Sequence, residues 1–138
     1  MVTSAGARGP AGLTANAVCS LSLEPLLMIV CIDRGSRTLE AIRHSRRLAV
    51  NVLARDQQRL AAVFASKEPE AEKFEGVAHD HVDGVPVLSG VVSWLVGSLR
   101  ELAPGGDHVI GIADVERVGT PGGEPLVYFR GSYHALSE

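Results

Sequence analysis

The sequence has few cysteines, no long apolar run and no cluster of positive charge. Its two cysteines, Cys19 and Cys31, lie in apolar runs without CxxC or Cys/His spacing. This favours buried, reduced thiols of a cytoplasmic protein over a disulfide framework. The longest clean apolar run, Leu26 to Ile32, is far shorter than the roughly 20 residues that span a bilayer. No charged-then-apolar leader follows Met1, so we expect neither a membrane anchor nor secretion.

The charge and the length of the chain exclude further classes of protein. The 11 arginines and 2 lysines are scattered and the net charge is −3, so we expect no nucleic acid as partner. With 138 residues, 46% of them hydrophobic and 21% charged, the chain can bury a core and is too apolar for a disordered segment. We therefore expect one globular domain over residues 1–138.

Strand patterns recur along the chain and predict a mainly β domain, a β-barrel with a few short helices. The Pro and Gly clusters between the strands are typical of turns, and long strands in this order favour a closed or nearly closed barrel. The expected strands are residues 12–22, 26–32, 48–53, 91–102, 108–118 and 126–136.

Two short helices are expected between these strands. The first follows Asp33, with Ser36 or Thr38 as its N-cap. The second starts near Asp56 as N-cap and places Leu60, Val63 and Phe64 on one face. The Glu-rich segment 67–73 reads as a solvated, mobile loop.

The stretch GLTANAVCSLSLEP, residues 12–25, inserts polar residues into an apolar run. Thr14, Ala15 and Asn16 offer a hydroxyl, backbone N–H groups and an amide that both donates and accepts. Such a set can read the edge of a flat heterocycle. The alternative is a plain strand whose Thr and Asn point outward.

The stretch CIDRGSRT, residues 31–38, has the order strand, Gly-containing turn, helix start. Free N–H groups, the hydroxyls of Ser36 and Thr38 and the guanidinium of Arg37 can converge there on an anion. Helix capping explains one of these hydroxyls but does not need all three side chains. A phosphate site is therefore favoured over simple capping.

Two further stretches carry weaker signals. In GGDH, residues 105–108, an Asp-His pair after two glycines is by itself typical of a hairpin turn. In YFRGSYH, residues 128–134, Gly131 interrupts a strand and allows close approach of backbone. The purely structural interpretation of the second stretch is a barrel strand with one bulge.

Taken together and in this order, these stretches resemble the flavin reductase-like family, the FMN-binding split barrels that serve as the small component of two-component flavin monooxygenases. The segments AVNVLARDQQRLAAVFAS (residues 49–66) and PLVYFRGSYH (residues 125–134) extend the resemblance from about Val2 to the chain end. It implies a Greek-key-like split barrel. Members usually carry a helix and a first strand ahead of the position of Val2, so we expect a shortened N-terminal strand.

The resemblance also assigns residues to a cofactor site. Thr14, Ala15 and Asn16 match the segment against the flavin ring, and Gly106, Asp107 and His108 match the GDH motif associated with the nicotinamide dinucleotide. The other matches are Ser20 and Ser22 near the ribityl and phosphate end, Ser36, Arg37 and Thr38 in the phosphate-binding turn, Phe64 and Ala65 bordering the ring, and Tyr133 in the pocket wall. For Phe64 the alternative is simple helix packing.

The implied activity is hydride transfer from NADH or NADPH to FMN or FAD, with no catalytic acid or base, because the cofactors carry the reaction. The resemblance implies a homodimer, with a flavin-dependent monooxygenase as acceptor of the reduced flavin. The sequence leaves two alternatives open: a flavin-binding module without reductase activity, and an oxidase of the pyridoxamine phosphate oxidase branch. The TAN and GDH matches argue against the oxidase.

A metal site is not expected. His79 and His81 have ligand-like spacing with Asp80 and Asp83 beside them, but no third or fourth ligand is evident. We interpret this segment as a solvated loop.

Overall fold

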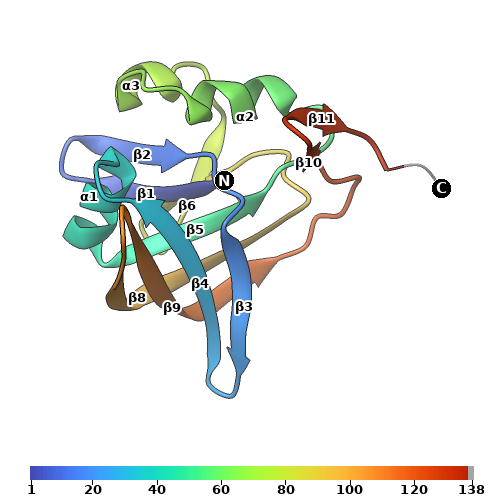
Figure 1. Ribbon diagram of the computed structural model, residues 1–138. Helices are drawn as coiled ribbons and strands as arrows, with labels where there is room; N and C mark the ends of the chain where they lie inside the picture. The colour runs from blue at the N-terminus through green and yellow to red at the C-terminus, as the bar shows by residue number, and fades with distance from the viewer. Residues whose placement is uncertain (137–138) are drawn as a thin grey trace.

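The computed structural model describes residues 1–136, which form a mostly β fold with three short helices in this part of the chain (Figure 1). The main sheet has seven strands in the order β2-β1-β5-β8-β9-β4-β3, all of them antiparallel to their neighbours. Its strands are β1 (Val2–Gly6), β2 (Gly9–Leu13), β3 (Val18–Leu23), β4 (Leu26–Asp33), β5 (Arg47–Val52), β8 (Ser93–Gly105) and β9 (His108–Gly119). The expected mainly β class is confirmed.

The remaining elements pack around this sheet. Helices α2 and α3 lie along one end, and the β10–β11 hairpin stands beside α2 (Figure 1). The bounds of these elements are α1 Arg37–Ser45, α2 Gln58–Ala65, α3 Glu70–Lys73, β6 His79–Val82, β7 Val85–Leu88, β10 Val127–Phe129 and β11 Ser132–His134. None of the helices in residues 1–136 is long and apolar enough to cross a membrane.

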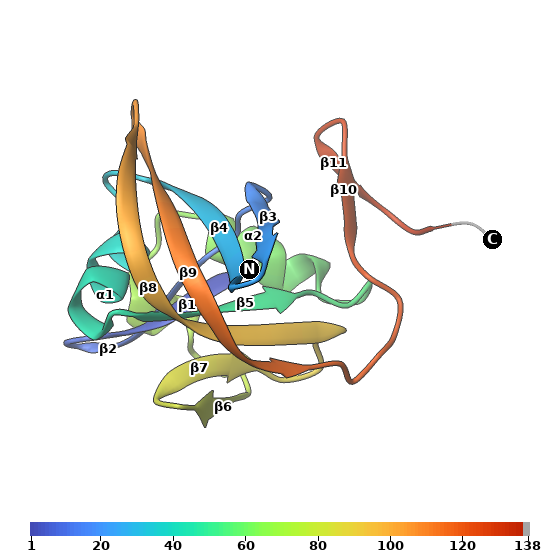
Figure 2. The same cartoon turned by 90° about the horizontal axis from the view of Figure 1, so that it is seen from below.

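The sheet is strongly bent but does not close into a barrel. Figure 2 shows the long β8–β9 hairpin curving across the molecule, and the pairing of these two strands shifts register between Val96 and Gly97 and again between Leu99 and Glu101. Such bulges bend a strand and increase its twist. The strands β2 and β3 are the two edges and do not pair, and α1 and α3 pack along β2.

Buried and half-buried residues alternate along β4, and its buried residues form part of the main core. Met28, Val30 and Ile32 are buried on one face of the strand, while the residues between them are half-buried. They pack with Leu39 and Ile42 of α1, which lie three residues apart and therefore on one side of that helix. The packing of α1 on the sheet fixes where its N-terminus lies.

Two expected strands are interrupted. The expected strand 12–22 leaves the sheet after Leu13 and returns at Val18, because Thr14 is bound to α2 through its amide and its hydroxyl. The expected strand 126–136 is a hairpin, because Arg130 and Gly131 turn the chain with φ angles of 52° and 80°. The expected shortened first strand, β1, pairs with both β2 and β5.

The structure also differs from the predicted start of the second helix and from the two predicted polar loops. Ser36 caps α1, as expected, but Gln57 precedes α2 in the place expected for Asp56, and its Oε1 accepts from the amide of Ala54. The expected mobile loop 67–73 contains α3, which is held by a buried Lys73. The expected solvated loop at His79 is the strand β6, which pairs with β7.

Candidate functional site

A cleft of about 550 Å³ opens between the loop after β2, the N-terminus of α1 and the turn between α2 and α3. Its volume falls in the range of roughly 300–1,000 Å³ that is usual for small-molecule sites. Its lining is Leu13, Thr14, Ala15, Asn16, Ala17, Cys31, Ile32, Asp33, Gly35, Ser36, Arg37, Phe64, Ala65, Ser66, Lys67, Glu70, Lys73 and His108.

The loop after β2 is fixed by α2. The Thr14 amide donates to the Phe64 carbonyl at 3.2 Å, and the Thr14 hydroxyl donates to the Ala61 carbonyl at 2.7 Å. The Thr14 side chain is therefore used to hold the loop. The neighbouring Asn16 is exposed, and its side-chain amide has no hydrogen bond to any residue in 1–136, so both of its polar atoms can meet a ligand.

The phenyl ring of Phe64 forms the floor under this loop. It is 1% exposed and packs edge-on against Phe74, with ring centroids 4.9 Å apart. A Cβ on Gly12 would lie 2.8 Å from the Phe64 ring, so β2 can approach α2 this closely only without a side chain at that position. Phe64 is thus both a core residue and part of the cleft wall.

The opposite wall is the turn from β4 into α1. Asp33 accepts from the Gly35 amide at 2.7 Å, and the Ser36 hydroxyl accepts from the Thr38 amide at 3.1 Å. The amides of Leu39 and Glu40 donate to the Ser36 carbonyl, so the Arg37 amide is the N–H group of this first turn without an acceptor in residues 1–136. A helix N-terminus of this kind favours an anion.

The β8–β9 turn is joined to this wall. Arg34 donates from its Nε to the Gly106 carbonyl at 2.6 Å and from its amide to the Asp107 carbonyl at 3.0 Å. His108 lies opposite Asp33 in the β4–β9 register and reaches the cleft. Its Nδ1 lies 2.8 Å from Oδ1 of Asp107, and this hydrogen bond, together with the ring's charge, lowers the pKa of Asp107.

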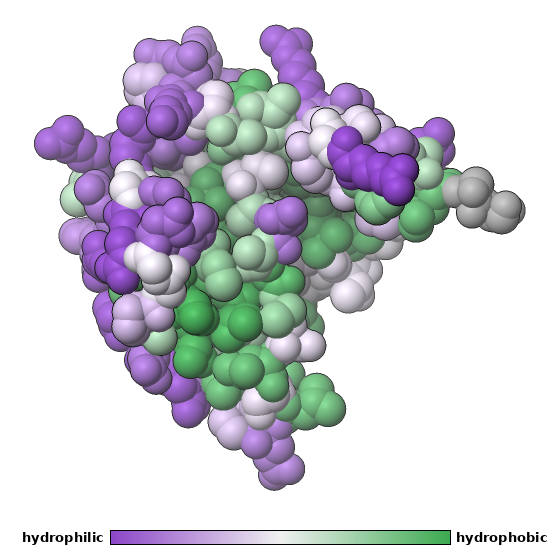
Figure 3. All heavy atoms as spheres, in the orientation of Figure 1, coloured by the Kyte–Doolittle hydropathy of each residue, from purple (hydrophilic) through white to green (hydrophobic). Residues whose placement is uncertain are grey.

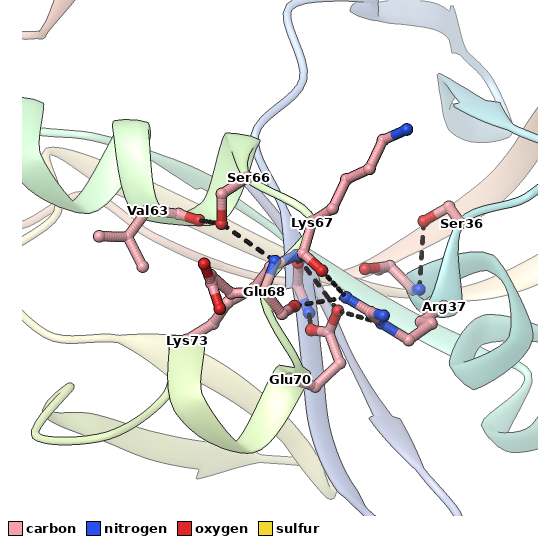
Figure 4. A network of polar contacts seen from close by, with 10 residues as sticks. Ser36, Arg37, Val63, Ser66, Lys67, Glu68, Glu70 and Lys73 are labelled. Atoms are coloured by element: carbon pink, nitrogen blue, oxygen red, sulfur yellow. Dashed lines mark hydrogen bonds and ion pairs between the residues drawn. The ribbon is translucent and has the colours of Figure 1, made fainter.

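Arg37 points along the cleft rim toward the α2–α3 turn (Figure 4). Its Nη2 donates to the carbonyls of Lys67, at 2.9 Å, and of Glu68, and its Nε donates to Oε1 of Glu70 at 3.3 Å. Glu70 also accepts from Lys73 at 3.2 Å and from the Gly12 amide at 2.8 Å. This polar network connects α1, α3 and β2 around one side of the cleft.

Eight of the fourteen residues expected at the site line this cleft, and six do not. The cleft residues among them are Thr14, Ala15, Asn16, Ser36, Arg37, Phe64, Ala65 and His108, with Gly106 and Asp107 in the adjoining turn. The four that lie elsewhere are Ser20, Ser22, Thr38 and Tyr133.

Each of the four has a structural reason for its place. Ser20 and Ser22 flank a bulge in β3, beyond the loop that reaches the cleft. Thr38 is 1% exposed inside α1, and its Oγ1 has no hydrogen-bond partner within residues 1–136. Tyr133 packs against Tyr128 in the terminal hairpin, with ring centroids 5.1 Å apart, and against the core cluster around Phe64.

Sequence reasoning missed the cleft residues of the Glu-rich segment, Lys67, Glu70 and Lys73. A signal was present in their rarity: the chain has only two lysines, and they stand at the two ends of this segment. A solvated loop rich in glutamate does not explain why both lysines of the chain lie in this segment. Their convergence on the cleft depends on α3 packing against β2, which local sequence patterns do not reveal.

Within residues 1–136 no group of three or more His, Cys, Asp or Glu side chains is placed to hold a metal ion. His79 uses its Nδ1 on the Val77 carbonyl at 2.8 Å and packs edge-on against His81.

The cleft fits a flat ring that carries an anion. Its apolar side chains include Leu13, Ile32 and Phe64, which suit a ring face. The Asn16 amide can meet the polar edge of a ring, and the α1 N-terminus with Ser36 can meet a phosphate. No acid–base pair is needed for this arrangement, because positioning is its main contribution.

Comparisons with known proteins agree with this fit. The flavin reductase like domain family matches residues 1–137. An FMN reductase (NADH) of Rhizobium rhizogenes is 37% identical over 138 residues, which cover 99% of this chain and 80% of the relative. The reductase component of a 4-nitrophenol 4-monooxygenase/4-nitrocatechol 2-monooxygenase of Rhodococcus opacus is 36% identical and covers 96% of this chain and 71% of its own length.

A solved structure shows the same architecture. The NADH:FAD oxidoreductase of Streptomyces globisporus superposes with a TM-score of 0.90 at 28% identity, over 99% of this chain and 78% of its own. Because the family match spans nearly the whole sequence, this chain belongs to the flavin reductase like domain family.

Proposed function

We propose that this chain, acting as one domain, is an NADH-dependent flavin reductase that works on FMN or FAD in the cleft between the loop after β2 and the N-terminus of α1. The observation that carries the proposal is the convergence of Asn16, Ser36 and His108, from three separate segments, on one cleft with an apolar floor. The related FMN reductase (NADH) and NADH:FAD oxidoreductase support both cofactors.

The roles of the residues follow from their places in the cleft. Asn16 faces the polar edge of the ring, while Ala15, Phe64 and Ala65 border its apolar part. The Ser36 hydroxyl and the Arg37 amide at the N-terminus of α1 bind the phosphate end. His108, with Gly106 and Asp107 beside it, contacts the dinucleotide at the β8–β9 turn, which Arg34 holds against the opposite wall.

The bound flavin supplies the redox chemistry, because it accepts a hydride equivalent from reduced nicotinamide. The chain's own residues bind and orient the two rings. The Thr14 hydrogen bonds keep the loop after β2 in place, and Phe64 excludes water from beneath it. Such preorganised positioning is the main catalytic contribution available to a site without an acid or base.

A flavin-dependent monooxygenase is the proposed acceptor of the reduced flavin. The relative from Rhodococcus opacus is itself the reductase component of a two-component monooxygenase. The proposed location is the cytoplasm, since Cys19 and Cys31 are free thiols in the structure. The expectation that they are buried is wrong, because Cys19 is exposed and Cys31 is half-buried.

The chain is proposed to act as a homodimer through the β3–β4 hairpin. Figure 3 shows an apolar surface over these strands, and Leu21, Leu23 and Leu26 there are about half exposed or more. The strand β3 is also a free edge of the main sheet, which invites pairing with another chain. Because Ala17 lines the cleft directly before β3, a second copy on this hairpin would lie close to the flavin.

Oxidation of NADH and of NADPH, with FMN and FAD titrated separately, tests the proposal after the spectrum of the purified protein has been recorded. Saturable turnover that depends on added flavin is expected, with NADH the better reductant. A flavin spectrum or tight flavin binding without turnover would instead identify a flavin-binding module and contradict the reductase.

A further inference from the structure

The polar network around Glu70 assigns different roles to the two cations at the cleft rim. We infer that Lys67 is the cation that binds the flavin phosphate, and that Arg37 is a positioning residue that fixes the turn carrying Lys67. This inference rests on the proposed function and concerns the phosphate end of the same cleft.

The guanidinium of Arg37 already forms hydrogen bonds within the protein. It donates to the carbonyls of Lys67 and Glu68 and to Glu70, which balances its charge at 3.3 Å. A guanidinium is a rigid planar fork, so turning it toward a ligand would break these hydrogen bonds together. Its place in the structure is thus that of a clamp on the α2–α3 turn.

Lys67 lies in the turn that Arg37 holds, but its side chain, unlike that of Arg37, is not hydrogen-bonded to the described part of the protein. Its backbone carbonyl accepts from Arg37, while its side chain extends away from the network (Figure 4). It is exposed and lines the cleft together with Ser36. Within residues 1–136 its ammonium has no hydrogen bond or ion pair. An ammonium is a compact charge with three donors and is a common phosphate ligand.

The other cations near the cleft are bound elsewhere. Lys73 is 5% exposed and pairs with Glu70 at 3.2 Å, and Arg34 holds the β8–β9 turn through the Gly106 carbonyl. Lys67 is therefore the cation of this cleft whose charge is not matched by a neighbouring acceptor in the described part of the chain. Arg37 contributes by fixing the backbone from which Lys67 projects.

Binding of FMN and of riboflavin tests the inference, because the two ligands differ only in the phosphate. Dissociation constants are measured by flavin fluorescence for the wild type, Lys67→Ala, Arg37→Ala and the double variant. We expect Lys67→Ala to weaken FMN about tenfold or more, as loss of a charge-assisted hydrogen bond does, and to leave riboflavin unchanged. Arg43→Ala, an exposed position in the last turn of α1, is the matched control and should change neither constant.

The double variant separates the two roles. If Arg37 acts through Lys67, Arg37→Ala also lowers the preference for FMN over riboflavin, and adding it to Lys67→Ala lowers that preference no further. If Arg37 binds the phosphate directly, the two losses multiply, which would overturn the inference. An unchanged FMN preference in Lys67→Ala would overturn it as well, while NADH-dependent turnover in the wild type would still support the proposed function. A wild type that binds neither flavin contradicts both.

Chemical labelling gives a second readout that does not depend on any variant. The chain has only two lysines, so acetylation of the wild type by acetic anhydride, followed by mass spectrometry, reports on each. FMN should protect Lys67 and riboflavin should not. Equal labelling of Lys67 in the presence of FMN and of riboflavin would contradict a phosphate contact.

Discussion

His108 is the side chain through which the β8–β9 turn reaches the cleft. It lies at the start of β9 opposite Asp33 and bonds Asp107 beside it. No other titratable group of the cleft contacts its ring in the described structure, so a role as proton donor has no relay to support it. Its position instead suits contact with the dinucleotide.

Replacing His108 by Ala should raise KM for NADH several-fold and change kcat little, because a contact made equally in ground and transition states affects binding alone. Steady-state kinetics with saturating FMN measure both constants. His44→Ala, at an exposed position in the last turn of α1, serves as control. An unchanged KM with a collapse of kcat would show that the imidazole takes part in the chemical step.

The roles of some residues in the site can be predicted from their neighbours in the sequence, and the roles of others cannot. The N-cap role of Ser36 follows from a local rule, since the capping hydroxyl and the amide it accepts from are two residues apart. The direction of Arg37 could not be predicted in this way, because its acceptors lie about thirty positions later in the chain. Likewise, Thr14 was expected at the ring but uses its hydroxyl on α2.

At the scale of elements, the curved β8–β9 hairpin depends on a bulge at Gly97. A Cβ at this position would lie 2.2 Å from the backbone oxygen of Asp114 in the paired strand, closer than any real contact. The bulge therefore requires glycine here, because the backbone it would meet belongs to the sheet itself.

We expect Gly97→Ala to lower the free energy of unfolding by about 1–3 kcal/mol, the usual cost of overpacking a buried site. Urea unfolding measures the change. Gly105→Ala, in the same strand, is the matched control: its Cβ would meet only ordinary contacts with Ile110 and His108, at 3.4 Å and beyond, and should change stability by less than about 0.5 kcal/mol. Equal stability of both variants would contradict the role given to the bulge.

The elements that sequence predicted well are those whose pattern is local. The strands β4 and β9 and helix α1 lie where hydrophobic alternation and a capping residue placed them. Helix α3 was missed because its charged residues resemble a solvated loop, whereas Lys73 is buried and contacts Gly12 and Glu70. The terminal hairpin was read as one strand because a turn and a bulge at Gly131 give the same local signal.

At the scale of the whole molecule, the two edges of the sheet have different surroundings. α1 and α3 pack along β2, whereas β3 carries exposed leucines, of which Leu23 is 87% exposed. The sequence predicted a barrel because long antiparallel strands alternate with turns, but closure is a property of the whole sheet and is not encoded in any one strand.

Leu23→Lys should shift the protein from dimer to monomer and weaken flavin binding, because a charge would be buried in the proposed interface. The fold of each chain should persist, since Leu23 has little contact within its own chain. Analytical ultracentrifugation gives the association state, with Ala7→Lys in the exposed β1–β2 turn at the opposite edge as control. A wild type that is monomeric at micromolar concentration would refute this interface.

The measurement that tests the central claim most directly is the anaerobic reduction of FMN by NADH, with FMN in large excess over the purified protein. We predict bleaching of the flavin absorbance at a rate proportional to protein concentration and saturable in both NADH and FMN, with many flavins reduced per chain. A rate no higher than that of NADH and FMN without protein would contradict the assignment of this cleft as the site of flavin reduction.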